Sequence, residues 1–164
     1  MIVISDTTPI ISLLKAEQLE LLKHLFGEVV IPEAVYKELI GNEAFWLEAE
    51  EIKQCPFIKV RQVEDQKSVH IFRKVTGLDA GESEAIVMAE ERQADLLLMD
   101  EQKGRRVAKQ MGLVITGTIG ILMQAYDEDL LSGGAVETCL ISMKKCGIRI
   151  GEALLGTIRT HIRG

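Results

Sequence analysis

Two carboxylates stand directly after short apolar runs in this chain. Asp6 follows Ile2-Val3-Ile4-Ser5, and Asp100 follows Leu96-Leu97-Leu98-Met99. Such runs predict strands that are buried on both faces of a parallel sheet. A carboxylate at the carboxyl end of such a strand lies where α/β sheets bind ligands. For Asp6 alone, an equally good interpretation is that it caps the helix whose first turn holds Pro9, because Asp is a favoured N-cap residue.

Glutamates on predicted helices could join these aspartates. Glu38 lies within a helix, on the same side as small and apolar residues, and its alternative role is that of a solvated surface residue. Glu82 lies near the start of another helix, on the side that should pack on the sheet, or it completes a capping box with Asp79. Glu84 points to the opposite, peripheral side. It is the alternative third acid, because the register near a helix start decides which residue faces the sheet.

The elements that must position these acids are strands and helices in alternation, which predicts a parallel sheet with helices on both faces. We therefore predict an α/β fold, a three-layer α/β/α sandwich with a central parallel sheet and additional C-terminal helices. Right-handed crossovers gather the carboxyl ends of parallel strands at one edge. Asp6 and Asp100 should share that edge, and Glu38 and Glu82 can reach it from the sides.

Converging carboxylates repel one another, which raises their pKa values and destabilises the fold unless a cation joins them. Mg²⁺ and Mn²⁺ prefer oxygen ligands and keep several waters. Such a site suits metal-assisted phosphodiester hydrolysis, because the cation activates a water and neutralises charge that develops on the phosphate. The predicted cofactor is therefore Mg²⁺ or Mn²⁺, and the predicted metal-binding and catalytic residues are Asp6, Glu38, Glu82 and Asp100.

A basic helix follows the second of the two strands. It carries four cations within seven residues, Lys103, Arg105, Arg106 and Lys109. Beside an acidic strand end these cations indicate phosphate binding, whereas a charge run by itself is more often a solvated helix face.

Composition limits the class of protein. The chain has 164 residues and a net charge of −6, which argues against a passive, charge-driven nucleic-acid binder. Its single tryptophan, Trp46, offers no stacking platform for bases. No apolar run approaches the roughly 18 residues that span a membrane, and no secretory signal is visible. Three cysteines without metal-ligand spacing read as reduced thiols, so we expect a cytoplasmic protein without membrane contact.

The chain shows no linker or repeat. We predict one domain over residues 1–164, with a core of about 1–130 and a C-terminal helical extension of about 131–164. Further predicted helices cover residues 43–54, 135–147 and 151–162. A threonine, Thr116 or Thr118, is the predicted cap of the helix over 119–126.

An ordered set of short motifs resembles the PIN domain, the ribonuclease fold of VapC-type toxins, and within it a widespread prokaryotic PIN-like subfamily. The set extends over most of residues 2–125, and only its order is specific. Its members are Val3-Ile4-Ser5-Asp6-Thr7-Thr8-Pro9-Ile10, Val30 to Leu39, Leu78-Asp79-Ala80-Gly81-Glu82-Ser83-Glu84-Ala85-Ile86, Leu98 to Glu101 with Arg105 and Arg106, and Ile115-Thr116-Gly117-Thr118-Ile119-Gly120.

The resemblance implies a role for each matching position. Asp6, Glu38 and Asp100 match the first, second and fourth metal-binding acids, and Thr7 matches a hydroxyl that supports the site. The third acid is usually an aspartate; here Glu82 stands in its place, with an arm one methylene longer, and Glu84 is the alternative. The implied function is a Mg²⁺- or Mn²⁺-dependent endoribonuclease with an RNA substrate, toxin-like and held in check by an antitoxin protein. We also expect a homodimer, from exposed apolar residues on the closing helices.

Two other functions compete with this hypothesis. The first is a catalytically inactive PIN-like module that binds nucleic acid or protein and keeps its carboxylates for structure. The second is an aspartyl-phosphate phosphatase. Those enzymes use an Asp-x-Asp pair after the first strand, and Thr8 at the second position argues against it.

Overall fold

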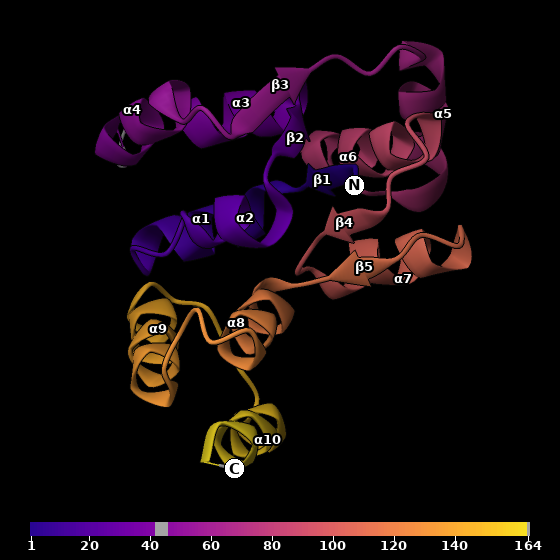
Figure 1. Cartoon of the computed structure of the whole chain (residues 1–164). Coiled ribbons are helices and arrows are strands. Elements are labelled where there is room, and N and C mark those ends of the chain that lie inside the picture. Colours follow the sequence, from indigo (N-terminus) through magenta and orange to yellow (C-terminus); the bar gives the residue numbers. More distant parts are fainter. Residues whose placement is uncertain (42–45, 164) are drawn as a thin grey trace.

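The structure, a computed structural model, describes residues 1–41 and 46–163 (Figure 1). Within these residues its centre is a five-stranded sheet in the order β3-β2-β1-β4-β5, and all neighbouring strands are parallel. The strands are β1 (Val3–Ser5), β2 (Val29–Pro32), β3 (Ile58–Arg61), β4 (Leu96–Leu98) and β5 (Ile115–Thr116). The predicted central parallel sheet is confirmed.

Helices fill the connections between the strands and the C-terminal part of the chain. The helix predicted from residue 43 is described from Trp46 onward, and residues 43–45 lie outside the described residues. The helices are α1 (Thr7–Lys15), α2 (Leu21–Phe26), α3 (Glu33–Ile40), α4 (Trp46–Gln54), α5 (Gln66–Thr76), α6 (Ala80–Glu91), α7 (Gln102–Gln110), α8 (Thr118–Asp127), α9 (Gly133–Lys145) and α10 (Glu152–Arg163).

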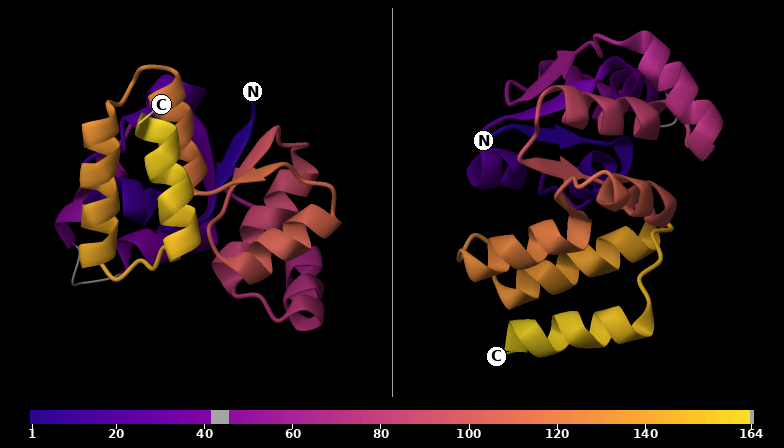
Figure 2. Two further views of the ribbon diagram at one scale, coloured as in Figure 1. Left: turned by 90° about the horizontal axis from the view of Figure 1, so that it is seen from below. Right: turned by 90° about the vertical axis from the view of Figure 1, so that its right-hand side faces the viewer.

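The sheet separates two hydrophobic cores, which makes the predicted three layers. Successive strand residues point to opposite faces, so Val3 and Leu98 join one core while Ile4 and Leu97 join the other. Residues of α1, α2, α8, α9 and α10 belong to the first core, and residues of α5, α6 and α7 belong to the second. Figures 1 and 2 show α8, α9 and α10 together on one side of the molecule.

The acids that follow β1 and β4 leave the sheet at one edge, as predicted. The register pairs Ser5 with Leu98, and the backbone N–H of Asp6 donates to the carbonyl oxygen of Leu98 at 2.9 Å. Strands β2 and β3 lie on one side of β1, and β4 and β5 lie on the other. The carboxyl end of β1 is therefore a topological switch point, the place where open α/β sheets bind ligands.

Helix α6 is more deeply buried than its sequence pattern predicts. Glu82, Ala85 and Ile86 are buried, in agreement with the predicted sheet-facing side. Val87 and Met88, on the side opposite Glu82, are buried as well. The reason is that α3 and α5 both pack against α6 and cover what a single sheet contact would have left exposed.

The C-terminal helices pack on α8. The hydroxyl of Tyr126 donates to the carbonyl oxygen of Ile162 at 3.1 Å, and the ring of His161 lies 2.6 Å from the carboxylate of Asp127. These contacts hold α10 against the domain; the division into a core and an extension stays a prediction. In the described part of the chain, no helix is both long and apolar enough to cross a membrane.

Candidate active site

Asp6 is a buried carboxylate that does not cap the helix it precedes. It occupies the N-cap position of α1, yet its side chain accepts no capping hydrogen bond from that helix. Only 5% of the residue is exposed. The side-chain hydrogen bond that the capping interpretation predicts is therefore absent, and the buried carboxylate calls for another explanation.

Glu38 meets Asp6 over the start of α6. The hydroxyl of Thr7 donates to Glu38 Oε2 at 2.8 Å, which fixes the glutamate beside α1. A Cβ atom placed on Gly81 would lie 3.0 Å from Glu38 Oε2 and 3.6 Å from Asp6 Oδ1. The missing side chain of Gly81 thus leaves the space in which the two carboxylates approach each other. Three helices meet at this point: α1 contributes Thr7, α3 contributes Glu38 and α6 contributes Gly81.

Burial and neighbouring carboxylates dominate the electrostatic environment of Asp6. Burial raises its pKa from an ordinary 3.8 to about 7, and the carboxylates of Asp79, Glu38 and Glu101 add to the increase, while the backbone N–H of Thr7 opposes it. A carboxylate in this state binds a proton at neutral pH unless a cation takes the proton's place.

Glu82 forms the capping box that was its alternative role. Asp79 Oδ1 accepts from the backbone N–H of Glu82 at 2.8 Å, and Glu82 Oε1 accepts from the backbone N–H of Asp79 at 3.3 Å. Its other oxygen, Oε2, is buried and has no hydrogen-bond partner among the described residues. That oxygen lies 3.1 Å from where a Cβ of Gly104 would be, so it points at α7. Burial and a side-chain hydrogen bond with the Asp79 carboxyl group raise the pKa of Glu82 to about 7, while the backbone N–H of Asp79 opposes the increase.

Glu84, the alternative third acid, lies against α3. Its Oε1 accepts from the backbone N–H of Ala34 at 3.2 Å, in the first turn of that helix. The carboxylate thus satisfies a free N–H group of α3 and does not join Asp6 and Glu38.

Asp100 lies at the same sheet edge, but both of its oxygens are occupied. Oδ1 accepts from the backbone N–H of Thr118 at 2.7 Å, and Oδ2 accepts from the Thr118 hydroxyl at 2.7 Å. Asp100 therefore holds the start of α8. The prediction that Thr116 or Thr118 caps this helix is wrong, because Gly117 occupies the N-cap position.

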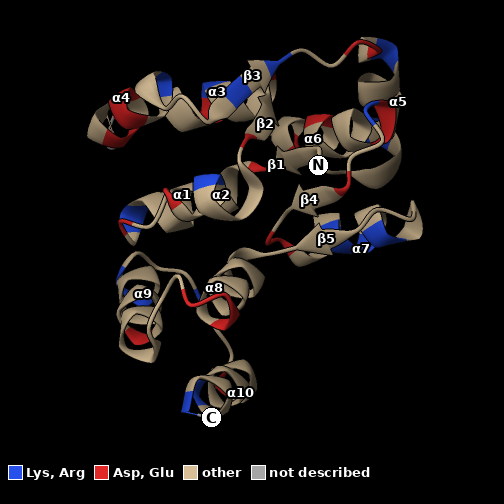
Figure 3. Ribbon diagram, in the orientation of Figure 1, with Lys and Arg blue, Asp and Glu red and all other residues tan. Residues whose placement is uncertain are grey.

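The four cations of α7 differ in their surroundings. Arg105 Nη1 donates to the carbonyl oxygen of Met99 at 2.9 Å, which fixes the guanidinium beside Asp100. Lys103 Nζ lies 3.0 Å from where a Cβ of Gly77 would be, next to the end of α5. Arg106 and Lys109 are exposed. In Figure 3 these cations mark α7, and the loop that enters it from β4 is acidic.

Sequence reasoning missed two acids of this region. Asp79 and Glu101 both contribute to the raised pKa values of Asp6 and Glu82. The sequence pattern predicts Asp79 only as a helix cap, a role that it has, and Glu101 follows the more conspicuous Asp100. The available signal was the position of Glu101, one residue beyond an acid that was already expected at the sheet edge.

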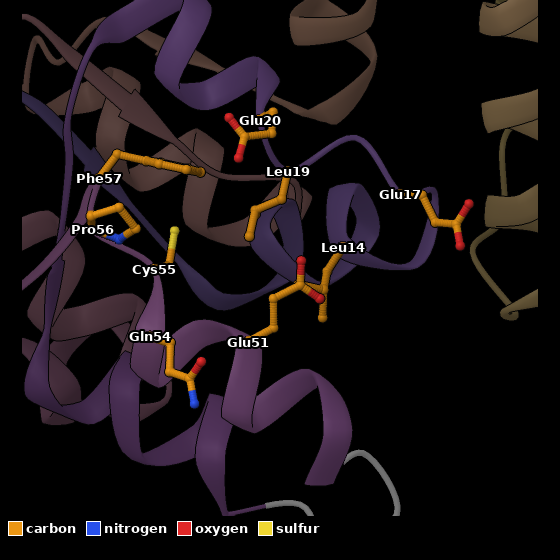
Figure 4. Close-up of a pocket in the computed structure, with 9 residues that line it drawn as sticks. All are labelled: Leu14, Glu17, Leu19, Glu20, Glu51, Gln54, Cys55, Pro56 and Phe57. Carbon is orange, nitrogen blue, oxygen red and sulfur yellow. The ribbon is translucent and has the colours of Figure 1, made fainter.

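A second acidic pocket lies elsewhere and does not belong to the site. It has a volume of about 480 Å³ and is lined by Glu17, Glu20, Glu51 and Cys55 among others (Figure 4). Burial raises the pKa of the Cys55 thiol, and the neighbouring carboxylates of Glu20 and Glu51 add to this. A thiol in such surroundings stays protonated and is a poor nucleophile or metal ligand.

The donor set at Gly81 fits a hard divalent cation. Within residues 1–41 and 46–163, no group of three or more His, Cys, Asp or Glu side chains is arranged to hold a metal ion. Asp6 and Glu38 nevertheless present carboxylate oxygens to a shared space, and Mg²⁺ binds to one or two carboxylates with waters in its other positions. The charged groups that shift the pKa of Asp6 are the carboxylates of Asp79, Glu38 and Glu101, which supports the same fit.

Comparison with known proteins identifies the family. A family model described as a PIN domain matches residues 2–163, so the chain belongs to the PIN-domain family. No curated protein and no solved structure gives a significant match. PIN domains are generally nucleases that use divalent metals, and membership therefore indicates a nuclease-type hydrolase.

Proposed function

We propose that this PIN-domain protein is an endoribonuclease that hydrolyses phosphodiester bonds with Mg²⁺ or Mn²⁺. The observation that supports the proposal best is Asp6, a buried carboxylate at the sheet switch point that makes no side-chain capping hydrogen bond and faces Glu38 across Gly81. Asp100, in contrast, places both of its oxygens on Thr118.

In this proposal the side chains divide the work. Asp6 and Glu38 hold the cation, and Thr7 orients Glu38 through its hydroxyl. When bound, a divalent cation supplies positive charge that lowers the pKa of an attacking water and neutralises charge on the phosphate oxygens. The cations of α7 hold the phosphate backbone, because their charges lie beside the acidic loop.

Glu82 and Asp100 remain in the proposed site as its third and fourth acids. Glu82 is included because its Oε2 is buried without a hydrogen-bond partner among the described residues, which is costly for a carboxylate oxygen unless a cation or proton compensates it. Asp100 is included because it leaves the sheet at the same edge as Asp6.

The test combines metal binding and cleavage in the same samples. Mn²⁺ is titrated into the wild type, Asp6→Asn and Glu84→Gln by calorimetry, and each sample then receives a labelled single-stranded RNA with and without EDTA. We expect binding and EDTA-sensitive cleavage in the wild type and in Glu84→Gln, and neither in a folded Asp6→Asn protein. Glu84→Gln is the matched control because it removes an acid that lies against α3. Full cleavage by folded Asp6→Asn would refute the assignment.

A second candidate function has one observation in its favour. Among the described residues no three acids are arranged to hold a metal, since Glu82 completes a capping box and Asp100 binds Thr118. This arrangement suits a module that binds nucleic acid or protein without cleaving it. RNA binding that is unchanged by EDTA, with no Mn²⁺ heat and no cleavage, would favour this function.

We propose further that the nuclease is toxin-like, that an antitoxin protein restrains it, and that it forms a homodimer. Exposed apolar residues on the closing helices support an interface, and Ile141 on α9 is one of them. Light scattering after size-exclusion chromatography tests the dimer, and Ile141→Glu should shift the protein to a monomer. Equal masses for the wild type and the Ile141→Glu variant would contradict this interface.

A further inference from the structure

A groove beside the candidate site is closed on one side by the C-terminal part of the chain. It has a volume of about 580 Å³. One wall comes from α7, β5 and the start of α8 and includes Arg105, and the other comes from the connection between α9 and α10 and includes Arg149. Thr8 and Asp100 also line it. Because Thr8 follows Asp6 by two residues, the groove borders the proposed active site.

The two arginines give the groove its charge. Arg105 donates one N–H to the carbonyl oxygen of Met99, and a guanidinium has five N–H donors. Arg149 is exposed, and in the described part of the chain no carboxylate pairs with it. Asp100 is the acid that lines the groove, and its oxygens accept from Thr118. Guanidinium groups with free donors suit phosphate, which they bind in a bidentate manner.

The remaining lining indicates which part of a nucleic acid fits. Aliphatic side chains such as Ile115, Ile150 and Leu154 form much of the surface, and none of the residues that line this groove is aromatic. Bases that are held by stacking need aromatic platforms. The groove therefore suits a sugar–phosphate backbone held at its charges.

We propose that this groove binds the backbone of single-stranded RNA beside Asp6, with Arg105 and Arg149 contacting phosphates from opposite walls. The proposal rests on the nuclease function and adds a substrate-binding role for the C-terminal extension, which carries Arg149. Binding of this kind is tolerant of sequence, because phosphate contacts carry no base information.

The test measures RNA binding separately from cleavage. The protein carries Asp6→Asn, the buffer contains EDTA, and the probe is a dye-labelled oligouridylate of about ten nucleotides followed by fluorescence anisotropy at several salt concentrations. Adding Arg149→Ala should weaken binding about tenfold, the scale of one charge-assisted hydrogen-bonded contact. It should also make the salt dependence shallower, by about 0.7 for each lost phosphate contact in a plot of log affinity against log salt.

Lys144→Ala is the matched control. Lys144 lies on α9 and lines, as Arg149 also does, the neighbouring groove between α9 and α10, but it does not line the proposed groove. The variant's affinity should stay within about twofold of the parent, because an exposed charge outside the groove makes no direct phosphate contact and is screened by salt. Equal losses for Arg149→Ala and Lys144→Ala would overturn the proposal, since they would reflect net charge alone.

A second pair of variants tests the groove by blocking it. Leu154 lines the groove and is 45% exposed, and Ile71 on α5 is 61% exposed outside it, so both accept a glutamate without burying a charge. Leu154→Glu should weaken RNA binding by at least tenfold through repulsion of phosphate, and Ile71→Glu should not. No difference between the two, or no RNA binding by the parent at low salt, would overturn the inference. Groove-dependent binding by a protein that never cleaves RNA would refute the nuclease function and leave the groove assignment standing.

Discussion

The buried, ionised carboxylate of Asp6 destabilises the folded protein when no metal is bound, and Asp6→Asn should remove this destabilisation. Burial raises the pKa of Asp6 from 3.8 to about 7, a difference that corresponds to at most about 4 kcal/mol of lost stability once the carboxylate is ionised. Asparagine has nearly the same shape and no charge. In EDTA at pH 8 the variant should therefore unfold at a higher temperature, by about 10 °C for a chain of this size.

The pH dependence gives the sign of the effect. A carboxyl group whose pKa is higher in the folded state binds more protons folded than unfolded between pH 4 and about 7, so stability falls as the pH rises through that range. Below pH 4 the group is protonated in both states and the penalty disappears. Wild type and Asp6→Asn should thus be equally stable near pH 4 and diverge toward pH 8.

Urea denaturation at pH 4, 6 and 8, with EDTA in every sample, measures the effect. Adding Mn²⁺ at pH 8 should stabilise the wild type and leave Asp6→Asn unchanged, because the variant lacks the buried carboxylate that is proposed to hold the cation together with Glu38. The reasoning is refuted if Asp6→Asn is no more stable than the wild type at pH 8, or if its advantage persists undiminished at pH 4.

Three further predictions concern neighbouring contacts. Gly81→Ala should weaken Mn²⁺ binding in calorimetry more than it lowers the melting temperature, because its Cβ would displace the Glu38 carboxylate 3.0 Å away. Thr118→Val should cost about 1–3 kcal/mol in urea denaturation, because it leaves an Asp100 oxygen without its donor; an unchanged midpoint would contradict this. Thr7→Val should weaken Mn²⁺ binding while Thr7→Ser retains it, since the hydroxyl orients Glu38.

The sequence was sufficient to predict the sheet and the edge at which the acids emerge. Runs such as Leu96–Met99 are apolar enough to be buried on both faces, and parallel pairing then places the ends of β1 and β4 together. Asp6 could be placed from this alone, because its neighbours in sequence and in the sheet both fix its backbone.

The hydrogen-bond partners of the other acids could not be predicted from local pattern. Asp100 binds Thr118, 18 residues away, and Glu84 binds the backbone of Ala34, 50 residues away. Such pairs depend on how helices pack on the sheet, which a helical period does not encode. The capping box of Asp79 and Glu82 is local, and for that reason its motif was recognisable.

Three glycines connect these observations, because each one stands where a carboxylate would otherwise meet a side chain. Gly81 lies against Asp6 and Glu38, Gly104 against Glu82 Oε2, and Gly117 against Asp100. Missing side chains at all three positions let α6, α7 and the start of α8 approach the acids closely, which concentrates negative charge at one sheet edge. Packing accounts for Gly104, where a Cβ would meet the Met99 sulfur at 2.6 Å, but it gives no reason for the concentration of acids. A requirement for a bound cation gives one, and it predicts that the stability lost at this edge in EDTA returns when Mn²⁺ is added.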